Sequence, residues 1–234
     1  MGRVMFSGGK VGMSVPVAGI LASALAVGSV VKLMEGGVAT EYLVVNQGIP
    51  SGSSLYDDSC DGTWLLRKDI KESRQLHNSA NFNNYQNSTI HAWLNGDFFN
   101  LLGSIEQSTI KQVKIPYVNG YRSVASGSNG ISTKIFLLSG YEIGFTQSDH
   151  EEVPIDGGKL SYFGHLKNTV AFLNGEQIYW WLRSLISAHR GTGWVVNVGL
   201  ASTSVTSSYG IRPALIIPST AKFDYDTMIL KGVA

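Results

Sequence analysis

The sequence predicts an α+β fold in which short antiparallel strands surround two helices in the first half of the chain. Three observations favour this class. Helical patterns lie close together at residues 88–102 and 104–111, and runs of β-branched and aromatic residues lie before and after them. Strands and helices do not alternate as they do in a parallel sheet, and the 234 residues contain no internal repeat.

Residues 1–26 are predicted to be an N-terminal arm, and residues 27–234 to form the domain. The stretch from Val11 to Val31 carries no charge and is long enough to cross a bilayer. Its many glycines, serines and alanines make it only mildly apolar, and Ala24-Leu25-Ala26 also fits the cleavage site of a secretory signal. We favour an arm for assembly or anchoring, with a signal peptide and a membrane segment as the alternatives.

Strands and helices then follow in order. Ser29–Met34 and Val38–Asn46 flank Glu35-Gly36-Gly37, which is typical of a hairpin. After a turn-rich stretch, Thr63–Leu66 is a short apolar strand. The first helix is predicted to follow a cap at Asn87-Ser88, with Ile90, Trp93 and Leu94 on one face. The second is expected over Ser104–Lys111, and the later strands over Gln112–Tyr117, Lys134–Ser139, Ile178–Arg183, Trp194–Val198 and Gly210–Ile217.

Composition and charge exclude several classes of function. The net charge is +1 and no basic run is present, so a nucleic-acid partner is not expected. The single cysteine, Cys60, excludes an internal disulfide and a thiolate-rich zinc site. The five histidines are scattered, and we predict no metal and no cofactor. Asp149, Glu151 and Glu152 cluster as a calcium site would require, but without EF-hand spacing.

Two motifs carry a resemblance. They are Tyr179-Trp180-Trp181-Leu182-Arg183-Ser184 and Gly210-Ile211-Arg212-Pro213-Ala214-Leu215. With upstream runs at residues 28–33, 41–45, 61–66 and 134–139, they resemble the C-type-lectin-like domain of gut-bacterial and phage proteins, which is related in fold to formylglycine-generating enzymes. The resemblance covers about residues 25 to 220 and implies a C-type-lectin-like fold.

We predict that both motifs are scaffold. Trp180, Trp181 and Pro213 supply apolar surface for the core, and carboxylates or carbonyls are expected to hold Arg183 and Arg212. The interval between the two motifs, about residues 185–209, contains more small and mixed residues than the motifs themselves. It resembles the variable region that a diversity-generating retroelement rewrites in some such proteins, although an ordinary polar hairpin is the plainer alternative.

If the interval is variable, its side chains are expected to lie together on one exposed face and to bind a ligand. The residues predicted for this surface are Ile186, Ala188, His189, Arg190, Thr192, Val195, Asn197, Ala201, Thr203, Val205 and Tyr209. Trp194 lies among them, but its size favours a packing role.

The resemblance implies a phage virion protein, in the tail or bound to it, that recognises a host cell-surface receptor, either protein or glycan. The arm would contact other virion subunits, and a homotrimer is favoured. A secreted or surface-anchored bacterial adhesin is the alternative. An enzyme like the formylglycine makers comes third, because those relatives use cysteine pairs and copper. Cys60 stands alone in an acidic turn that should raise its pKa, so we predict no enzyme.

Overall fold

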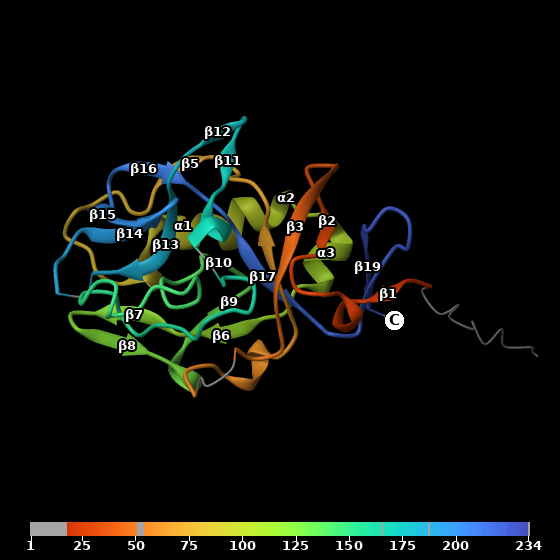
Figure 1. The fold of residues 1–234 in the computed structure, drawn as a ribbon, viewed down its shortest axis with the longest axis horizontal. Coiled ribbons are helices and arrows are strands. Elements are labelled where there is room, and N and C mark those ends of the chain that lie inside the picture. The colour runs from red at the N-terminus through yellow and green to blue at the C-terminus, as the bar shows by residue number, and fades with distance from the viewer. Residues whose placement is uncertain (1–17, 51–53, 165, 187, 234) are drawn as a thin grey trace, which may run out of the picture.

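The computed structural model describes residues 18–50, 54–164, 166–186 and 188–233. It is mostly β, with 37% strand and 16% helix, one substantial helix and several small sheets. The predicted α+β class, with a C-type-lectin-like fold and two early helices, is therefore wrong. Most of the chain outside the helical segment is committed to strands and turns (Figure 1).

The substantial helix covers residues 89–101. It begins as α1 (Thr89–Trp93), passes through a π-helical turn (Leu94–Phe98) and ends as α2 (Phe99–Leu101). The hydroxyl of Ser88 accepts the N–H of His91 at 3.1 Å, which confirms the predicted cap. The second predicted helix is only α3 (Ser104–Thr109), because the next residue, Ile110, already has extended backbone. The helix over residues 89–101 and the six-residue α3 do not form the two helices that the α+β prediction required.

A five-stranded antiparallel sheet lies beside this helix. Its strand order is β10 (Ile135–Phe136), β17 (Ala214–Ile217), β4 (Thr63–Arg67), β3 (Val38–Gln47) and β2 (Val30–Glu35). The predicted β2–β3 hairpin is confirmed. Its turn consists of two glycines with positive φ, a conformation that side chains disfavour.

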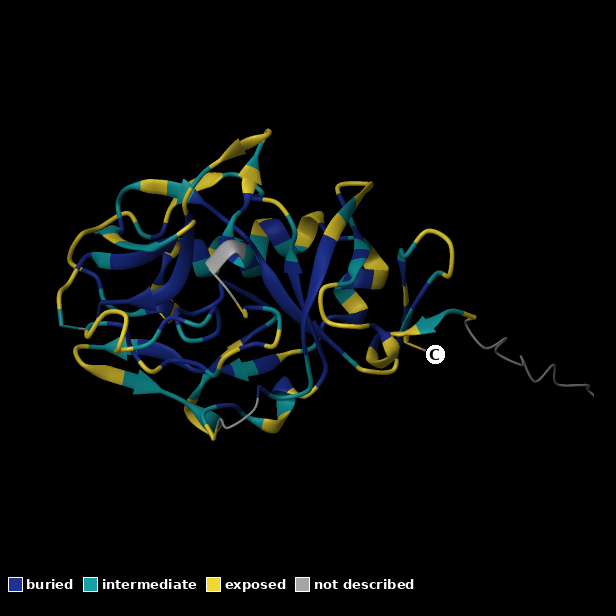
Figure 2. Ribbon diagram, viewed as in Figure 1, coloured by how far each residue is buried: buried dark blue, intermediate teal, exposed yellow. Residues whose placement is uncertain are grey.

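The middle of this sheet is the core of the molecule. Every residue of β17 is buried, and Trp64 of β4 packs edge-on against Phe136 and Tyr56, with ring centroids 5.6 and 5.5 Å away. The buried residues follow the central strands, whereas the exposed ones gather in the turns (Figure 2). Burial of large aromatic side chains contributes most of the stabilisation in such a core.

A second five-stranded sheet forms the other half. Its order is β15 (Leu200–Ser204), β14 (Thr192–Val196), β13 (Trp180–Leu185), β16 (Ser208–Gly210) and β5 (Ser73–Gln75). All neighbours are antiparallel except β13 and β16, which run parallel. Figure 1 shows this sheet at one end of an elongated molecule.

Four small sheets complete the fold. They are β6 (Val113–Ile115) with β9 (Ile131–Thr133), β7 (Tyr117–Gly120) with β8 (Ser123–Ala125), β11 (Phe172–Leu173) with β12 (Glu176–Gln177), and β1 (Ile20–Leu21) with β18 (Ala221–Phe223) and β19 (Leu230–Val233). The β7–β8 hairpin lies near the second sheet, and β1 and β19 lie at the opposite end of the molecule (Figure 1).

The end of the predicted arm is part of the domain. β1 pairs with β18, and Ala22 and Leu25 are buried. The side-chain amide of Gln47 donates to the carbonyls of both residues at 2.9 Å. Residues 1–17 of the arm lie outside the described residues. Within the described part, no helix combines the length and apolar character needed to cross a membrane.

Candidate functional site

The first motif lies on β13, where every residue is buried. The guanidinium of Arg183 makes two 2.6 Å bonds to the carboxylate of Glu142, and neither side chain is exposed. It also donates to the carbonyls of Pro116, Leu137 and Asp156 at 2.8–2.9 Å. The prediction that a carboxylate or carbonyls would hold Arg183 is confirmed, and the motif joins several segments that are distant in sequence.

The second motif is also buried. The Nε of Arg212 donates to the carbonyl of Arg67 at 2.8 Å, as predicted for a scaffold residue, and its guanidinium lies 5.1 Å from the ring centroid of Trp180. Burial lowers the pKa of Arg212 to about 10. The carbonyl of Pro213 accepts the N–H of Arg67 at 2.8 Å, and the indole N–H of Trp181 donates to the carbonyl of Arg74 at 2.9 Å.

Part of the predicted binding surface is in the core. Ile186, Val195, Asn197 and Val205 are at most 8% exposed, so the prediction that they lie on an exposed surface is wrong. For Val195 the physical reason is that β14 is buried from Gly193 to Val196 and has no outward row of side chains. Ile186, Asn197 and Val205 directly follow the ends of β13, β14 and β15 and are buried as well. Asn197 also has a structural role, because its side-chain oxygen accepts a 2.6 Å bond from the amide of Gln177.

The sheet separates most of the remaining predicted residues. Gly193 pairs with Thr203 and Trp194 with Ser202, so the two pairs point to opposite faces. Thr203 and Tyr209 lie on the face of Trp181, whose ring centroid is 5.4 Å from that of Tyr209. Ala201 shares their face, since it lies two residues from Thr203 along β15.

On the other face, His150 packs edge-on against Trp194, which supports the expected packing role of that tryptophan. His189 is exposed and lies 2.9 Å from the carboxylate of Glu152. Ala188 is close by, at the edge of a groove. Exposed Arg190 bonds to Asn81 at 2.7 Å, and Thr192 is half-buried at the start of β14. The prediction of one exposed face that carries all these residues is therefore wrong.

A groove lies beside Ala188. It encloses about 510 Å³. One wall is formed by Arg122 and Val124 of the β7–β8 hairpin, and the other by residues 151–155. Its lining combines a cation, two carboxylates and several apolar side chains. A hollow of this size lies within the range of roughly 300–1,000 Å³ that ligand sites occupy.

The lining of the groove includes the exposed residues Arg122 and Ile155, and exposed Tyr121 precedes Arg122 in the sequence. Tyr121 is 61% exposed and Ile155 is 49% exposed. The guanidinium of Arg122 lies 5.4 Å from the ring of Tyr121. Arg122 also has a φ of 49°, in the left-handed region that costs a side chain free energy. Tyrosine and arginine are enriched among interface hot spots.

Hydrogen bonds hold the backbone next to Ile155 in place. The next residue, Asp156, is fully buried, and the Ser184 hydroxyl donates to its carboxylate at 2.8 Å. Burial raises the pKa of Asp156 to about 7, against the opposing effect of Arg183. The backbone carbonyl of Asp156 accepts a 2.8 Å bond from Arg183. The groove therefore has a rigid, hydrogen-bonded base.

Two of the three acidic residues that cluster in the sequence, Asp149 and Glu152, have partners within the chain. Asp149 accepts the N–H of Thr146 at 2.7 Å and its hydroxyl at 3.0 Å, which closes a turn. Glu152 lies beside His189. Among the described residues, no three His, Cys, Asp or Glu side chains are grouped to hold a metal ion.

Cys60 is buried, and its thiol donates to the carbonyl of Lys114 at 3.1 Å. Its pKa is raised to about 12, first by burial and then by Glu142. The acidic turn was expected to be the cause, so the prediction had the right direction but the wrong main reason.

Sequence reasoning missed the groove. Tyr121 and Arg122 follow Gly120 between the predicted strands Gln112–Tyr117 and Lys134–Ser139, where no binding residue was predicted. A Tyr-Arg pair beside a glycine in a polar loop was the available signal, because large aromatic and cationic side chains in an exposed turn have little structural reason to be there. The approach of residues 147–155 to that loop had no local signal.

The sequence profile of a family described as a domain of unknown function (DUF6273) matches residues 61–219. This range contains both motifs and the whole lining of the groove. Comparison with curated proteins and with solved structures gave no match. Nothing in these comparisons links the chain to C-type-lectin-like domains or to formylglycine-generating enzymes.

Proposed function

The chain belongs to the DUF6273 family, and from this premise we propose that its domain is a non-enzymatic recognition module. Its ligand is a polypeptide segment of a partner protein, which binds in the groove between the β7–β8 hairpin and residues 147–155. The observation that carries the proposal is the groove of about 510 Å³, in whose lining Arg122 and Ile155 are exposed, with exposed Tyr121 next to Arg122 in the sequence.

The chemistry of the lining supports a peptide. Ile155, which is 49% exposed beside buried Val153 and Pro154, offers an apolar surface to one side chain of the ligand. Arg122 on the facing wall suits a carboxylate, and exposed Glu151 suits a cation. A peptide can present an apolar group and both charges at once, whereas a small apolar molecule would leave the charged groups without partners.

The particle or cell that carries the protein, and the receptor that it recognises, stay predictions. We propose the phage particle that the resemblance implies, with a host surface protein as the receptor, and a secreted or surface-anchored bacterial adhesin as the alternative. Retroelement diversification of the whole interval 185–209 is not part of the proposal. Random substitution at buried Val195 and Val205 would cost stability, since core positions tolerate few changes in volume.

A displayed library of random peptides, selected on the immobilised chain, tests the proposal. We expect enriched peptides to bind the wild-type chain and to lose about tenfold or more in affinity, which is ~1.4 kcal/mol, on Ile155→Asp. Because Ile155 is 49% exposed, the variant is expected to fold. Val38→Asp is the matched control, since Val38 is 65% exposed and lies in the β2–β3 hairpin, away from the groove (Figure 1).

Peptides that bind Ile155→Asp as tightly as the wild type would contradict the proposal, and so would a selection that enriches none. Equal loss on Ile155→Asp and Val38→Asp would place binding elsewhere and would also contradict it. Thermal unfolding of both variants shows whether each has kept its fold.

A further inference from the structure

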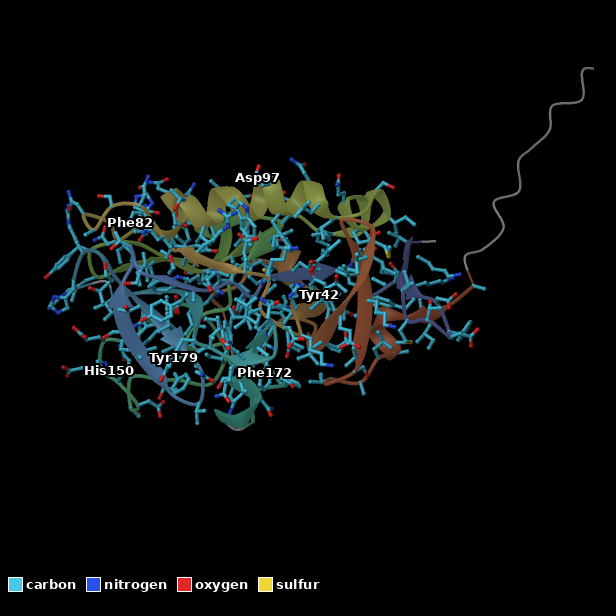
Figure 3. The ribbon with its side chains drawn as sticks, turned by 90° about the horizontal axis from the view of Figure 1, so that it is seen from above. Tyr42, Phe82, Asp97, His150, Phe172 and Tyr179 are labelled. Atoms are coloured by element: carbon cyan, nitrogen blue, oxygen red, sulfur yellow. The ribbon has the colours of Figure 1, made fainter. Side chains whose placement is uncertain are left out.

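A second, smaller hollow lies between β5 and α1. It encloses about 180 Å³ and is lined by Arg74, Gln75, Thr89, Ile90 and Trp93. The helix that begins with α1 and carries Asp97 runs along one side of the molecule, and His150, next to the groove, lies on the other (Figure 3). The two hollows therefore face different directions and share no lining residue.

Trp93 differs from the other tryptophans. The chain contains five, and Trp64, Trp180, Trp181 and Trp194 are at most 2% exposed. Trp93 alone is partly exposed, and it packs at the edge of the core with its ring centroid 5.5 Å from that of Phe98. An indole that is fixed from one side and reachable from solvent is a preformed stacking platform.

Arg74 covers this platform without being fixed to it. Its guanidinium lies 4.3 Å from the ring centroid of Trp93. It also pairs with Glu72, but the two side chains are 42% and 37% exposed. Exposed ion pairs contribute little stability, so a ligand can displace the guanidinium from the ring at low cost. The pair also leaves the hollow without net charge.

Uncharged polar groups surround the ring. Gln75 is exposed on β5, and its side-chain amide has no hydrogen bond among the described residues. The hydroxyl of Thr89 makes only a long bond, 3.3 Å, to the carbonyl of Leu76. Both can exchange hydrogen bonds with hydroxyl groups of a ligand, and the displaced Arg74 supplies further donors.

We propose that this hollow binds one ring of a neutral carbohydrate. The C–H face of a pyranose stacks on Trp93, and its hydroxyls bond to Gln75, Thr89 and Arg74. A peptide side chain suits the hollow less well, because Ile90, the aliphatic residue of its lining, is only 1% exposed. The proposal rests on residues other than those of the groove, so it stands or falls independently of the proposed function.

The test begins with the full chain on an array of neutral and sialylated glycans. The best neutral oligosaccharide is then titrated by calorimetry and by tryptophan emission. Because the other tryptophans are buried, a saturable change in emission reports on Trp93. We expect Trp93→Ala to weaken calorimetric affinity by more than about tenfold, and Gln75→Ala, an exposed change that leaves the core intact, by about threefold, which corresponds to one hydrogen bond.

Two controls separate this site from the groove and from a general loss of folding. Ile155→Asp, in the groove, and Tyr225→Ala, on a residue that is 64% exposed, must both leave glycan affinity unchanged. The proposal is overturned if no neutral glycan binds. It is equally overturned if binding leaves the emission of the wild-type chain unaltered, or if Trp93→Ala and Gln75→Ala both retain wild-type affinity while their thermal unfolding is normal.

Discussion

Two arginine–glutamate pairs in this molecule have opposite roles. Arg183 and Glu142 are completely buried, and carbonyls from three segments complete the hydrogen bonding of the guanidinium. Arg74 and Glu72 are about two-fifths exposed and lie over an indole ring. The buried pair thus stabilises the fold, whereas in the exposed pair Arg74 lies over the ring of Trp93, where a ligand can displace it. Burial, rather than the pairing itself, decides which role is adopted.

The largest expected effect comes from breaking the buried pair. Glu142→Ala leaves the Arg183 charge uncompensated in the core and is expected to cost about 3–5 kcal/mol of unfolding free energy. The matched change in the exposed pair, Glu72→Ala, is expected to cost less than about 1 kcal/mol. Urea unfolding of both variants measures the difference.

Similar losses in the two variants would contradict the comparison. A double variant, Glu142→Leu with Arg183→Met, tests whether the unpaired buried charge causes the loss of stability. Because that variant leaves no buried charge unpaired, we expect it to be more stable than Glu142→Ala alone.

A smaller effect follows from the carboxyl beside the buried pair. Burial raises the pKa of Asp156 from 3.8 to about 7 in the folded chain, while the charge of Arg183 lowers it and that of Glu142 raises it. A raised pKa means that the folded state favours the protonated carboxyl. The stability contributed by this group is therefore present below pH ~4 and is lost as pH rises to about 7, by on the order of 2–4 kcal/mol.

Asp156→Asn removes this titration while it keeps an oxygen that can accept the Ser184 hydroxyl. We expect the unfolding free energy of the wild type to fall, relative to that of the variant, between pH 4 and 7 and then to run parallel above pH 7.5. Urea unfolding across that range provides the measurement. Parallel curves over the whole range would show that Asp156 does not titrate there.

Some of this architecture could be predicted from the sequence. The scaffold roles of Trp180, Trp181, Arg183 and Arg212 were predicted because a large apolar side chain next to an arginine requires a buried, hydrogen-bonded setting. The β2–β3 hairpin was predicted because two glycines separate β-branched runs. The partner of Arg183 was not, since Glu142 lies 41 residues away and no local pattern joins them.

The binding surface was predicted less well, for a related reason. Small residues between the motifs suggested an exposed interval, but β14 lies between two other strands and has both faces covered. Val195 is therefore a core residue, and Val205, which follows β15, is fully buried as well. The groove joins three segments that are distant in sequence, and only the fold brings Arg122, Ile155 and Ala188 together.

The smallest expected effect concerns another arginine, Arg122, which lies in the turn between β7 and β8, outside both scaffold motifs. Its φ of 49° is costly for a side chain and free of cost for glycine. Arg122→Gly is therefore expected to raise the unfolding free energy by about 0.5–1 kcal/mol, although it removes the guanidinium that the proposed peptide would contact. Arg122→Ala removes the same guanidinium but keeps the strain, so it should show no such gain. If Arg122 serves ligand binding, both variants lose peptide affinity while only the glycine variant becomes more stable.

A glycine variant that is less stable than the wild type would mean that the Arg122 side chain stabilises the hairpin. Arg122 would then have a structural role, as Arg183 has, and the comparison between the two arginines would fail.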